Sequence, residues 1–584
     1  MNHPTPTKTG VFLRRGDFQT LTDALDYAAT GVSGINVYQS NGTMIDQATY
    51  TQLAEDAQDL ARSLSAFAPA GTLVGLLAQT SIDFAKLFFA CQYAGLIPVP
   101  MPLPTTMGGR ETYEAQIRKM VQSADIKALF VPSRLTEIAG RAMAGLDVPV
   151  LELGNPDLGT RRGDLRPHKP GDLCYIQYSS GSTNDPKGVI GSQESVTANC
   201  EGIITHGLQV VEGDRAVSWL PLYHDMGLIG FMISPIMSQV SLDLMEPSSF
   251  ARRPLTWLDL MTRNKGTLSY SPSFGYELCV KRWRDDRQFD LSSWRAAGIG
   301  GDMVRAEVLE AFADTFASHG FRQEAFVPSY GMAEATLAIA FAPLNQPLKT
   351  DRIDNDRLGR TGEAIPASDL TKDTQARTFV ACGRIMPGHD AEIRDENGKS
   401  LGERQVGRIC VRGPSVTPGY YQNEDATKAA FTEDGWLETG DLGYWLDGEV
   451  VVTGRSKDLI LWHGKNIWPQ DLEWAAEEAV NGRIGRLAAF AVAEADGTDA
   501  IRLLIECRSR DPEALHYVHS SASSAVSAAA GVPVSIQLVP LSSLVVTSSG
   551  KISRARARSK YLDGGFEDLL QSSREALERV ADAR

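Results

Sequence analysis

The chain has 584 residues, of which 43% are hydrophobic and 22% are charged, and its formal net charge is −15. This length exceeds what one hydrophobic core usually serves, and the ordinary composition excludes collagen, coiled coil and wholesale disorder. The negative charge argues against non-specific binding to nucleic acid or membrane surfaces, although a few local amides and cations are enough to hold an anionic ligand.

Strands alternate with helices in the first part of the chain. Residues 73–78 predict a buried strand, residues 81–93 a helix with one apolar side, and Ile97 starts another extended piece. Further strands are expected over 128–131 and 148–153. This alternation is typical of an α/β fold with largely parallel sheets.

The pattern changes near residue 450. A strand over 448–453 and a polar turn over 454–458 precede a compact α/β pattern of about 130 residues, a size that suits a small separate domain. The pattern predicts helices over 469–480 and 512–529, strands over 487–493 and 501–507, and a final exposed amphipathic helix over 566–580.

The seven cysteines are scattered and form no CxxC pair. We therefore expect reduced, packed thiols and neither a disulfide framework nor a zinc site. The N-terminal MNHPTPTKTG lacks the apolar stretch of a secretory signal, and the longest apolar regions are too short to span a bilayer. A cytoplasmic protein without an integral membrane segment is expected.

The strongest local signal is the run YSSGSTNDPKGV over 178–189, which follows an apolar segment. Small hydroxylated residues and glycine let backbone N–H groups approach phosphate oxygens, and a lysine adds positive charge. Proline precedes the lysine and glycine follows it, so this is not a Walker A loop. The candidate ligands are Ser179, Ser180, Gly181, Ser182, Thr183 and Lys187. Taken alone, the run is explained equally well as a surface Ser/Gly linker.

Five further motifs follow in order: LPLYHDMG at 220–227, YGMAE at 330–334, ETGD at 438–441, GRSKD at 454–458 and SSGK at 548–551. Any one is weak. Together the six resemble the adenylate-forming superfamily of acyl-CoA synthetases, peptide-synthetase adenylation domains and fatty acyl-AMP ligases, from about residue 15 to 560.

The resemblance implies a fold and two domains. The large N-terminal domain, 1–455, is expected to contain stacked, mostly parallel α/β sheets plus a β-barrel-like subdomain. A small, mobile C-terminal α+β lid domain, 456–584, would rotate about Lys457 between half-reactions.

The resemblance also assigns chemistry, with ATP and Mg²⁺ as cofactors. Lys551 would swing onto the carboxylate and α-phosphate and stabilise the charge of the transition state. Glu334 and Thr183 would hold Mg²⁺, a cation that prefers oxygen ligands. His224 would lie near the carboxylate, although a lone histidine is more often structural.

The remaining candidates concern the nucleotide. Tyr330 offers a face for adenine, Asp441 would accept hydrogen bonds from the ribose hydroxyls, and Arg455 would lie beside it. Outside this context a core tyrosine and solvated charges explain these residues. The adenine segment, often NGAEP in the family, here reads IGGDM over 299–303. The other nucleotide contacts expected are Gly300, Gly301, Asp302, Gly331, Met332 and Ala333.

Several segments, among them 219–230 and 271–279, resemble the fatty acyl-AMP ligase branch in particular. A surplus segment over about 348–378 fits that branch, in which an insert between the domains hinders the rearrangement needed for CoA. A tolerated surface insertion is the alternative. The acyl group would then pass to the phosphopantetheine thiol of a separate acyl carrier protein or carrier domain. Lys551, Arg554, Arg556, Arg558 and Lys560 form a candidate basic patch for this acidic partner.

The expected activity is activation of a medium- or long-chain fatty acid to acyl-adenylate plus pyrophosphate, for lipid, polyketide or lipopeptide biosynthesis. A medium- or long-chain acyl-CoA synthetase is the main alternative. A stand-alone amino-acid adenylation domain ranks lower, because residues 231–275 offer few carboxylates for a substrate ammonium. An inactive scaffold protein ranks lowest, because Lys551, Glu334 and Asp441 are all present.

Overall fold

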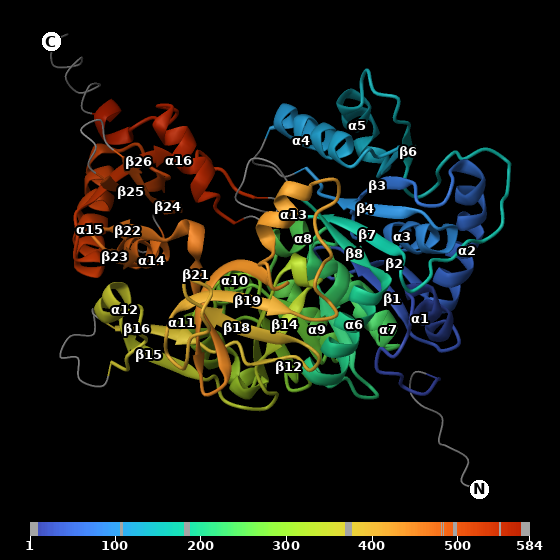
Figure 1. The fold of residues 1–584 in the computed structure, drawn as a ribbon, viewed down its shortest axis with the longest axis horizontal. Coiled ribbons are helices and arrows are strands. Elements are labelled where there is room, and N and C mark those ends of the chain that lie inside the picture. Colours follow the sequence, from blue (N-terminus) through green and yellow to red (C-terminus); the bar gives the residue numbers. More distant parts are fainter. Residues whose placement is uncertain are drawn as a thin grey trace, which may run out of the picture.

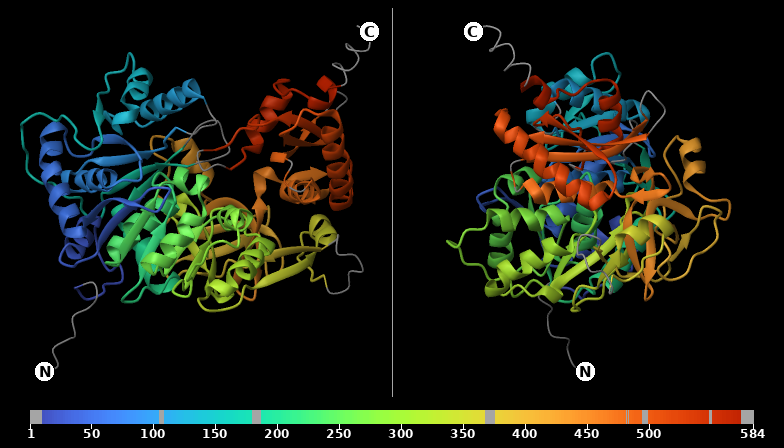
Figure 2. Two further views of the ribbon diagram at one scale, coloured as in Figure 1. Left: turned by 180° about the vertical axis from the view of Figure 1, so that it is seen from behind. Right: turned by 90° about the vertical axis from the view of Figure 1, so that its left-hand side faces the viewer.

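The computed structural model describes residues 10–104, 109–179, 187–367, 376–480, 482, 484–493, 499–547 and 551–573. It has the predicted α/β fold, with two main sheets flanked by helices, an antiparallel sheet and a C-terminal α+β part (Figure 1). Figure 2 shows the C-terminal elements, in orange and red, on one side of the larger part.

The largest sheet has the order β17-β14-β13-β12-β11-β9-β10-β1-β2. Its central pairs, from β1 to β13, are parallel, and its outer pairs β1–β2, β13–β14 and β14–β17 are antiparallel. The strands are β1 Gly34–Tyr38, β2 Met44–Thr49, β9 Arg215–Ser218, β10 Ser241–Met245, β11 Leu268–Ser271, β12 Ala296–Ile299, β13 Phe326–Gly331, β14 Ala338–Phe341 and β17 Arg384–Ile385.

A second, parallel sheet has the order β4-β3-β5-β6 and confirms the strands expected near the N-terminus. Its strands are β3 Leu73–Leu77, β4 Ile97–Met101, β5 Ala128–Val131 and β6 Val150–Glu152. The predicted helix is α3 (Ile82–Ala94), which the Ser81 side chain caps at its start and which ends at Gly95 in the left-handed region, φ 69°. The apolar side expected of α3 is buried, and so is almost every other residue of this helix.

Helices cover these sheets and connect their strands. They are α1 Leu21–Ala28, α2 Tyr50–Phe67, α4 Arg110–Ser123, α5 Thr136–Ala142, α6 Gln193–Gly202, α7 Ser234–Met237, α8 Pro247–Arg252, α9 Leu255–Asn264, α10 Ser273–Arg282 and α11 Ala306–Phe316. A π-helical segment, η3 (Met226–Ile233), leads into α7. The hairpin of β7 (Leu173–Tyr178) and β8 (Gly188–Ser192) flanks the predicted phosphate loop.

The expected barrel-like part is an open antiparallel sheet, β18-β19-β20-β21, in the described chain. Its strands are β18 Asp390–Arg394, β19 Gly407–Arg412, β20 Leu437–Leu446 and β21 Glu449–Arg455, and helix α13 is Glu424–Ala430. The surplus segment forms the hairpin β15 (Thr350–Asp354) and β16 (Ala376–Val380), with helix α12 (Asn355–Thr361) between them. Residues 368–375 of this segment lie outside the described chain.

The C-terminal part has its own hydrophobic cluster, built from residues between Ile460 and Leu569. Its elements are β22 Ile460–Trp462, β23 Lys465–Ile467, α14 Pro469–Val480, β24 Ile484–Ala493, β25 Asp499–Cys507, α15 Pro512–Ala530, β26 Val534–Pro540 and α16 Arg554–Leu562. The elements α14, α15, β24 and β25 match those predicted after residue 450, whereas β22, β23, β26 and α16 were not among the predictions. The domain boundary at 455/456 and rotation about Lys457 stay predictions.

Three smaller expectations meet different outcomes. The final helix lies partly outside the described chain; its described portion is helical from 569 to 573, and Leu569 is buried rather than exposed. All seven cysteines are free and buried, as expected. None of the helices described is long and apolar enough to cross a membrane.

Candidate active site

The residues singled out by the motifs come together where several strands of the large sheet end. Gly300 and Gly301 follow β12, Tyr330 lies at the end of β13, and Glu334 belongs to a 3-10 turn (Ala333–Ala335) just beyond it. In open α/β sheets, ligands bind outside the carboxyl ends of the parallel strands. Asp441 reaches the same place from β20.

Tyr330, Asp441 and Arg455 form one connected group. The buried Tyr330 hydroxyl donates to Asp441 Oδ2 at 2.8 Å, and Arg455 Nε lies 3.1 Å from Asp441 Oδ1. The register of β20 and β21 pairs Asp441 with Arg455 directly. This carboxylate raises the pKa of Arg455 and keeps the guanidinium charged.

A second group surrounds Glu334. Its Oε1 accepts a 2.9 Å hydrogen bond from the Tyr420 hydroxyl, and the Lys187 ammonium lies 4.6 Å from the centroid of the Tyr420 ring. Tyr420 therefore connects the carboxylate to the lysine at the end of the predicted phosphate loop. The sequence analysis missed Tyr420, because a tyrosine in a PGYY run carries no chemical signature of its own.

Lys551 reaches the site from the C-terminal part. Lys551 as a whole residue is exposed, and its Nζ donates to the carbonyl oxygen of Gly301. Burial of the amine lowers the pKa of Lys551, and the nearby Asp302 and Asp225 carboxylates oppose this shift. A lysine amine is thus held beside the glycines that follow β12.

Two carboxylates face the lysine. Burial raises the pKa of Asp302 to about 6, partly offset by Lys551 and by Ser273, whose N–H donates to Asp302 Oδ1 at 3.2 Å. Burial likewise raises the pKa of Asp225 to about 6, although the Met226 N–H donates to it at 2.8 Å. Asp225 lay inside the YHDMG motif but was not singled out by its chemistry.

His224 immediately precedes Asp225 at the start of η3. Its ring is half-buried and lies 4.6 Å, centroid to centroid, from the ring of Tyr223. Its proposed place near the carboxylate substrate stays a prediction. Met332 and Ala333 lie between Tyr330 and Glu334, and a side chain at Gly331 would meet the Leu337 carbonyl at 1.8 Å. Only glycine fits this approach.

A narrow, mostly apolar cavity of about 60 Å³ opens beside this site. Asp225, Gly300, Gly301 and Tyr330 of the site line it. The remaining lining is Ile203, Leu208, Met226, Gly230, Phe231, Tyr270, Ser329, Gly331, Leu337, Ala338 and Phe341. Such a cavity suits a hydrocarbon chain whose polar end lies among the charged groups.

The site described above does not include every predicted residue, because some lie outside the described chain. Ser180, Gly181, Ser182 and Thr183 lie outside the described residues, as do 548–550, while Ser179 follows β7 at the entrance of the loop. Lys457 is exposed in the 3-10 turn Ser456–Asp458, labelled η8, directly after β21.

The prediction that Arg554 belongs to an exposed basic patch is wrong. Its Nη1 lies 2.7 Å from Asp458 and its Nη2 lies 2.6 Å from Glu473, and all three side chains are at most 17% exposed. Glu473 also accepts the Ala489 N–H at 2.9 Å. This buried triad connects the turn that holds Lys457 to the start of α16, three residues after Lys551.

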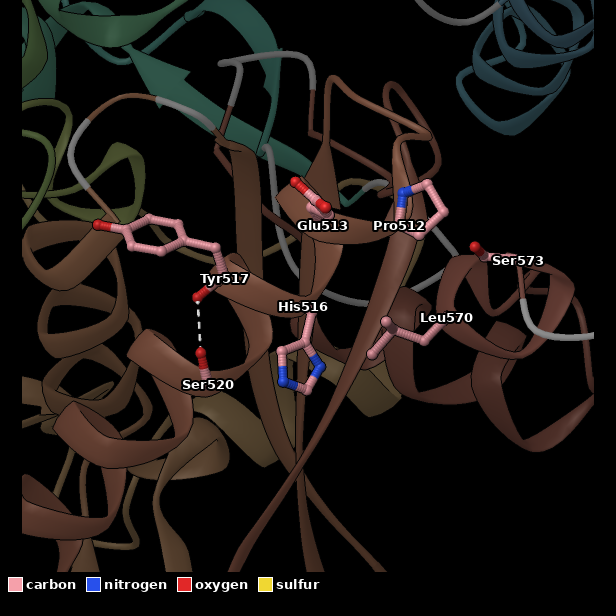
Figure 3. Close-up of a pocket in the computed structure, with 7 residues that line it drawn as sticks. All are labelled: Pro512, Glu513, His516, Tyr517, Ser520, Leu570 and Ser573. Atoms are coloured by element: carbon pink, nitrogen blue, oxygen red, sulfur yellow. Dashed lines mark hydrogen bonds between the residues drawn. The ribbon is translucent and has the colours of Figure 1, made fainter. Parts of the chain in front are cut away.

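A larger hollow of about 550 Å³ lies elsewhere, on the surface of the C-terminal part (Figure 3). Pro512, Glu513, His516, Tyr517 and Ser520 of α15 face Leu570 and Ser573 across it. It contains none of the motif residues and is open to solvent, so the chemistry belongs to the smaller cavity.

The order of the six motifs, the apolar cavity and the lysine amine beside the glycines after β12 fit an adenylate-forming enzyme. The sequence profile described as "AMP-binding enzyme" matches residues 36–421, about two thirds of the chain, and the chain belongs to this family. It is an ATP-dependent, adenylate-forming fatty acid ligase.

Relatives of known name or structure cover nearly the whole chain. A putative acyl-CoA synthetase of Caulobacter vibrioides is 46% identical over 97% of this chain and 99% of its own. A medium-chain-fatty-acid–[acyl-carrier-protein] ligase of Moorena producens is 30% identical over 95% and 97%. A structure from a study of fatty acyl-adenylate ligases of E. coli and L. pneumophila matches with a TM-score of 0.89 and 39% identity, over 95% and 99%.

Proposed function

We propose that this protein is a fatty acyl-AMP ligase, which forms acyl-adenylate and passes the acyl group to a carrier protein rather than to CoA. The observation that supports the proposal is the packing of the described residues of the 348–378 segment against the C-terminal part. The named activity of the Moorena relative supports the carrier, whereas the name of the Caulobacter relative favours the second candidate, an acyl-CoA synthetase.

The first half-reaction uses the site as it stands. A carboxylate oxygen of the fatty acid attacks the α-phosphorus of ATP, the new C–O–P bond forms, and the bond to the β-phosphate oxygen breaks to release pyrophosphate. Lys551, whose Nζ donates to the Gly301 carbonyl, would stabilise the negative charge that accumulates on the phosphoryl oxygens. Tyr330 and Asp441 would hold the adenosine.

Magnesium fits the donor set around Glu334. No cluster of three or more metal-ligating His, Cys, Asp or Glu side chains occurs in the described ranges. Mg²⁺ commonly takes only one or two protein oxygen ligands and completes its shell with water and phosphate. Glu334, with Thr183 as the second candidate, would hold an ion that neutralises phosphate charge.

The insert is held to the C-terminal part by a buried ion pair. Arg377 of β16 lies 3.0 Å from Asp471 of α14, and the two side chains are only 6% and 13% exposed. Asn355 donates to the same Asp471 at 3.2 Å. The Arg377 guanidinium also lies 4.3 Å from the ring centroid of Phe379. We call Arg377 and Asp471 the latch pair.

Apolar packing continues the same contact. One hydrophobic cluster combines Ile353 and Leu358 of the insert and Phe379 of β16 with Tyr444 of β20 and Trp468, just before α14. A side chain at Gly359 of α12 would meet the Asn466 carbonyl at 2.7 Å, so the two segments approach closely. Figures 1 and 2 show α12, in yellow, directly beside the C-terminal elements.

This contact disfavours rotation of the C-terminal part. Releasing the insert would expose the shared cluster and separate a buried ion pair, each of which costs free energy. A lid domain without such contacts can rotate to admit CoA, whereas a lid domain held by the insert keeps Lys551 in the adenylation site. The acyl-adenylate would then stay bound until a carrier protein displaces the C-terminal part.

The proposed carrier surface leaves out Arg554 of the basic patch first expected, because this side chain is only 15% exposed and is paired with Asp458 and Glu473. Arg558 is exposed and donates to the Ala491 carbonyl at 2.9 Å, and Arg556, two residues earlier on α16, has intermediate exposure. These two remain the candidate contacts for an acidic carrier. Reversing both to Glu is expected to slow acyl transfer while acyl-AMP formation stays unchanged; equal transfer rates would contradict this surface.

The test is transfer in trans. The enzyme is incubated with MgATP, a fatty acid and either the apo or the holo form of an acyl carrier protein from the same genome. We expect the carrier mass to rise by one acyl group only in the holo form, because only that form presents the phosphopantetheine thiol. Acylation of neither form, together with efficient acyl-CoA formation, would favour the synthetase.

A further inference from the structure

The turn that follows Glu334 has an unusual backbone. Thr336 lies directly after the 3-10 turn Ala333–Ala335, with φ 68° and ψ −56°. The Leu337 N–H donates to the Ala335 carbonyl at 2.8 Å, so Thr336 is the central residue of a γ-turn of the rare, strained kind. A β-branched residue at positive φ is an outlier, which persists only where the surrounding contacts hold it.

Asn199 of α6 bonds to the backbone on both sides of Thr336. Its amide nitrogen donates to the carbonyl oxygens of Ala335 at 3.2 Å and of Ala338 at 2.8 Å. Its amide oxygen accepts the Ala338 N–H at 3.1 Å. The side chain is fully buried. One amide therefore holds the residues before and after the γ-turn at a fixed separation.

A second contact holds Thr336 itself. Its hydroxyl donates to the Ser415 carbonyl at 2.8 Å, and both residues are buried. The Asn199 amide nitrogen lies 3.0 Å from Ser415 Oγ, which in turn lies 2.6 Å from His389 Nε2. Thr336, Asn199 and Ser415 thus form one connected buried network, in which each member limits the movement of the other two.

This network adjoins the group around Glu334. The Glu334 carbonyl accepts the Thr417 N–H at 2.8 Å, and its side chain accepts the Tyr420 hydroxyl. Asn199 lies on the helix that directly follows β8, the strand after the predicted phosphate loop. The asparagine thus connects this helix to the turn that bears Glu334. A displacement of about 1 Å within an active site is enough to lower a rate about 100-fold.

We propose that Asn199 is a positioning residue for adenylation. By holding the γ-turn at Thr336, it keeps the Glu334 carboxylate where it binds the divalent cation of the nucleotide. Asn199 is fully buried and does not line the cavity, so it acts through the turn rather than on the substrate. The proposal rests on the role proposed above for Glu334. A buried asparagine that only supports the fold would affect stability instead.

The experiment compares Asn199→Ala with Gln193→Ala. Gln193 is another fully buried amide of α6, which donates to Gln92 at 2.7 Å and accepts the Leu21 N–H at 2.9 Å. Its replacement removes a buried amide from the same helix but leaves the contacts to the turn. The first readout needs no turnover: Mn²⁺, which accepts the same oxygen ligands as Mg²⁺, is titrated by electron paramagnetic resonance in the presence of α,β-methylene-ATP.

Asn199→Ala should weaken Mn²⁺ binding about 10- to 100-fold, the range typical for loss of a residue that orients a metal ligand. The kcat for acyl-AMP formation should fall at least about tenfold, while KM for the fatty acid changes less than about twofold. Gln193→Ala should leave Mn²⁺ affinity and kcat within about twofold of wild type, even where it lowers thermal stability equally.

Asn199→Ser guards against loss of folding in the alanine variant. It keeps a small polar group but is too short to bond on both sides of Thr336, so it should act in the same direction. The proposal is overturned if a folded Asn199 variant binds Mn²⁺ like wild type, or if Gln193→Ala weakens binding as much. Failure of both Asn199 variants to fold would also overturn it and assign the residue to folding alone. Glu334→Gln identifies failure of the proposed function: if it leaves Mn²⁺ binding unchanged, Glu334 holds no cation and both proposals fail.

Discussion

The latch pair allows the most specific prediction. Arg377→Met removes the cation and leaves the Asp471 carboxylate buried in α14, where burial already raises its pKa. Breaking a buried ion pair on one side costs about 3–5 kcal/mol. We take the lower value, about 3 kcal/mol, because Asn355 still donates to Asp471.

That value converts into a measurable change. At 1.4 kcal/mol per factor of ten, about 3 kcal/mol shifts the balance between docked and released C-terminal part by roughly 100-fold. A part docked about 99% of the time would then be docked about half the time. Hydrogen exchange of the α14 amides should accelerate correspondingly, and acyl-CoA should form from acyl-AMP and free CoA.

Two further variants provide the controls. Arg360→Met removes an exposed ion pair of the same insert, Arg360–Asp356, with side chains 66% and 43% exposed, and should change neither readout. Arg377→Met combined with Asp471→Leu replaces the latch pair by apolar groups and should restore slow exchange. The reasoning is refuted if Arg377→Met is folded yet leaves both α14 exchange and the absence of acyl-CoA unchanged.

Three other predictions concern the adenylation step. Lys551→Ala should lower the rate of acyl-AMP formation, measured as pyrophosphate release, by about 10²–10³-fold. Because burial lowers the pKa of Lys551, the wild-type rate should start to fall at a lower pH than the pKa of an ordinary lysine predicts. A wild-type rate that does not change up to pH 11 would contradict this. Burial raises the pKa of Asp302 to about 6, so the negative charge opposite Lys551 is present above that pH and lost below it. The acid limb of the pH–rate profile should therefore flatten in the Asp302→Asn variant. An acid limb identical to that of the wild-type enzyme would contradict the assignment. Arg554→Met should lower kcat far more than it raises KM, because the triad of Arg554, Asp458 and Glu473 positions Lys551 without touching the substrate. Arg554→Lys should restore part of kcat. A change in KM alone would show that Arg554 is merely structural.

The sequence predicted the elements whose pattern is local. The strands β3, β4 and β5 and the helices α14 and α15 have clear apolar periods and Ser, Pro or Gly boundaries. The burial of α3 on nearly all sides was not predictable from its period, because a helix between two layers needs no polar face.

Contacts between segments that are far apart in the sequence could not be predicted from local sequence patterns. Tyr420 and Glu334 are 86 positions apart, and only the fold brings the phenol to the carboxylate. Asn199 and Ala338 are likewise 139 positions apart in the chain. Arg554 was misassigned because a run of basic residues on a helix is usually solvated, whereas Asp458 and Glu473 bury this one.

The central claim is that the enzyme forms acyl-adenylate and does not hand it to CoA. The most direct measurement is mass spectrometry of the products after purified enzyme is mixed with MgATP, octanoic acid and excess CoA. The account predicts that octanoyl-AMP accumulates and octanoyl-CoA does not. Efficient octanoyl-CoA formation would contradict this claim. It would mean that the contact between the insert and the C-terminal part does not decide whether CoA or a carrier protein accepts the acyl group.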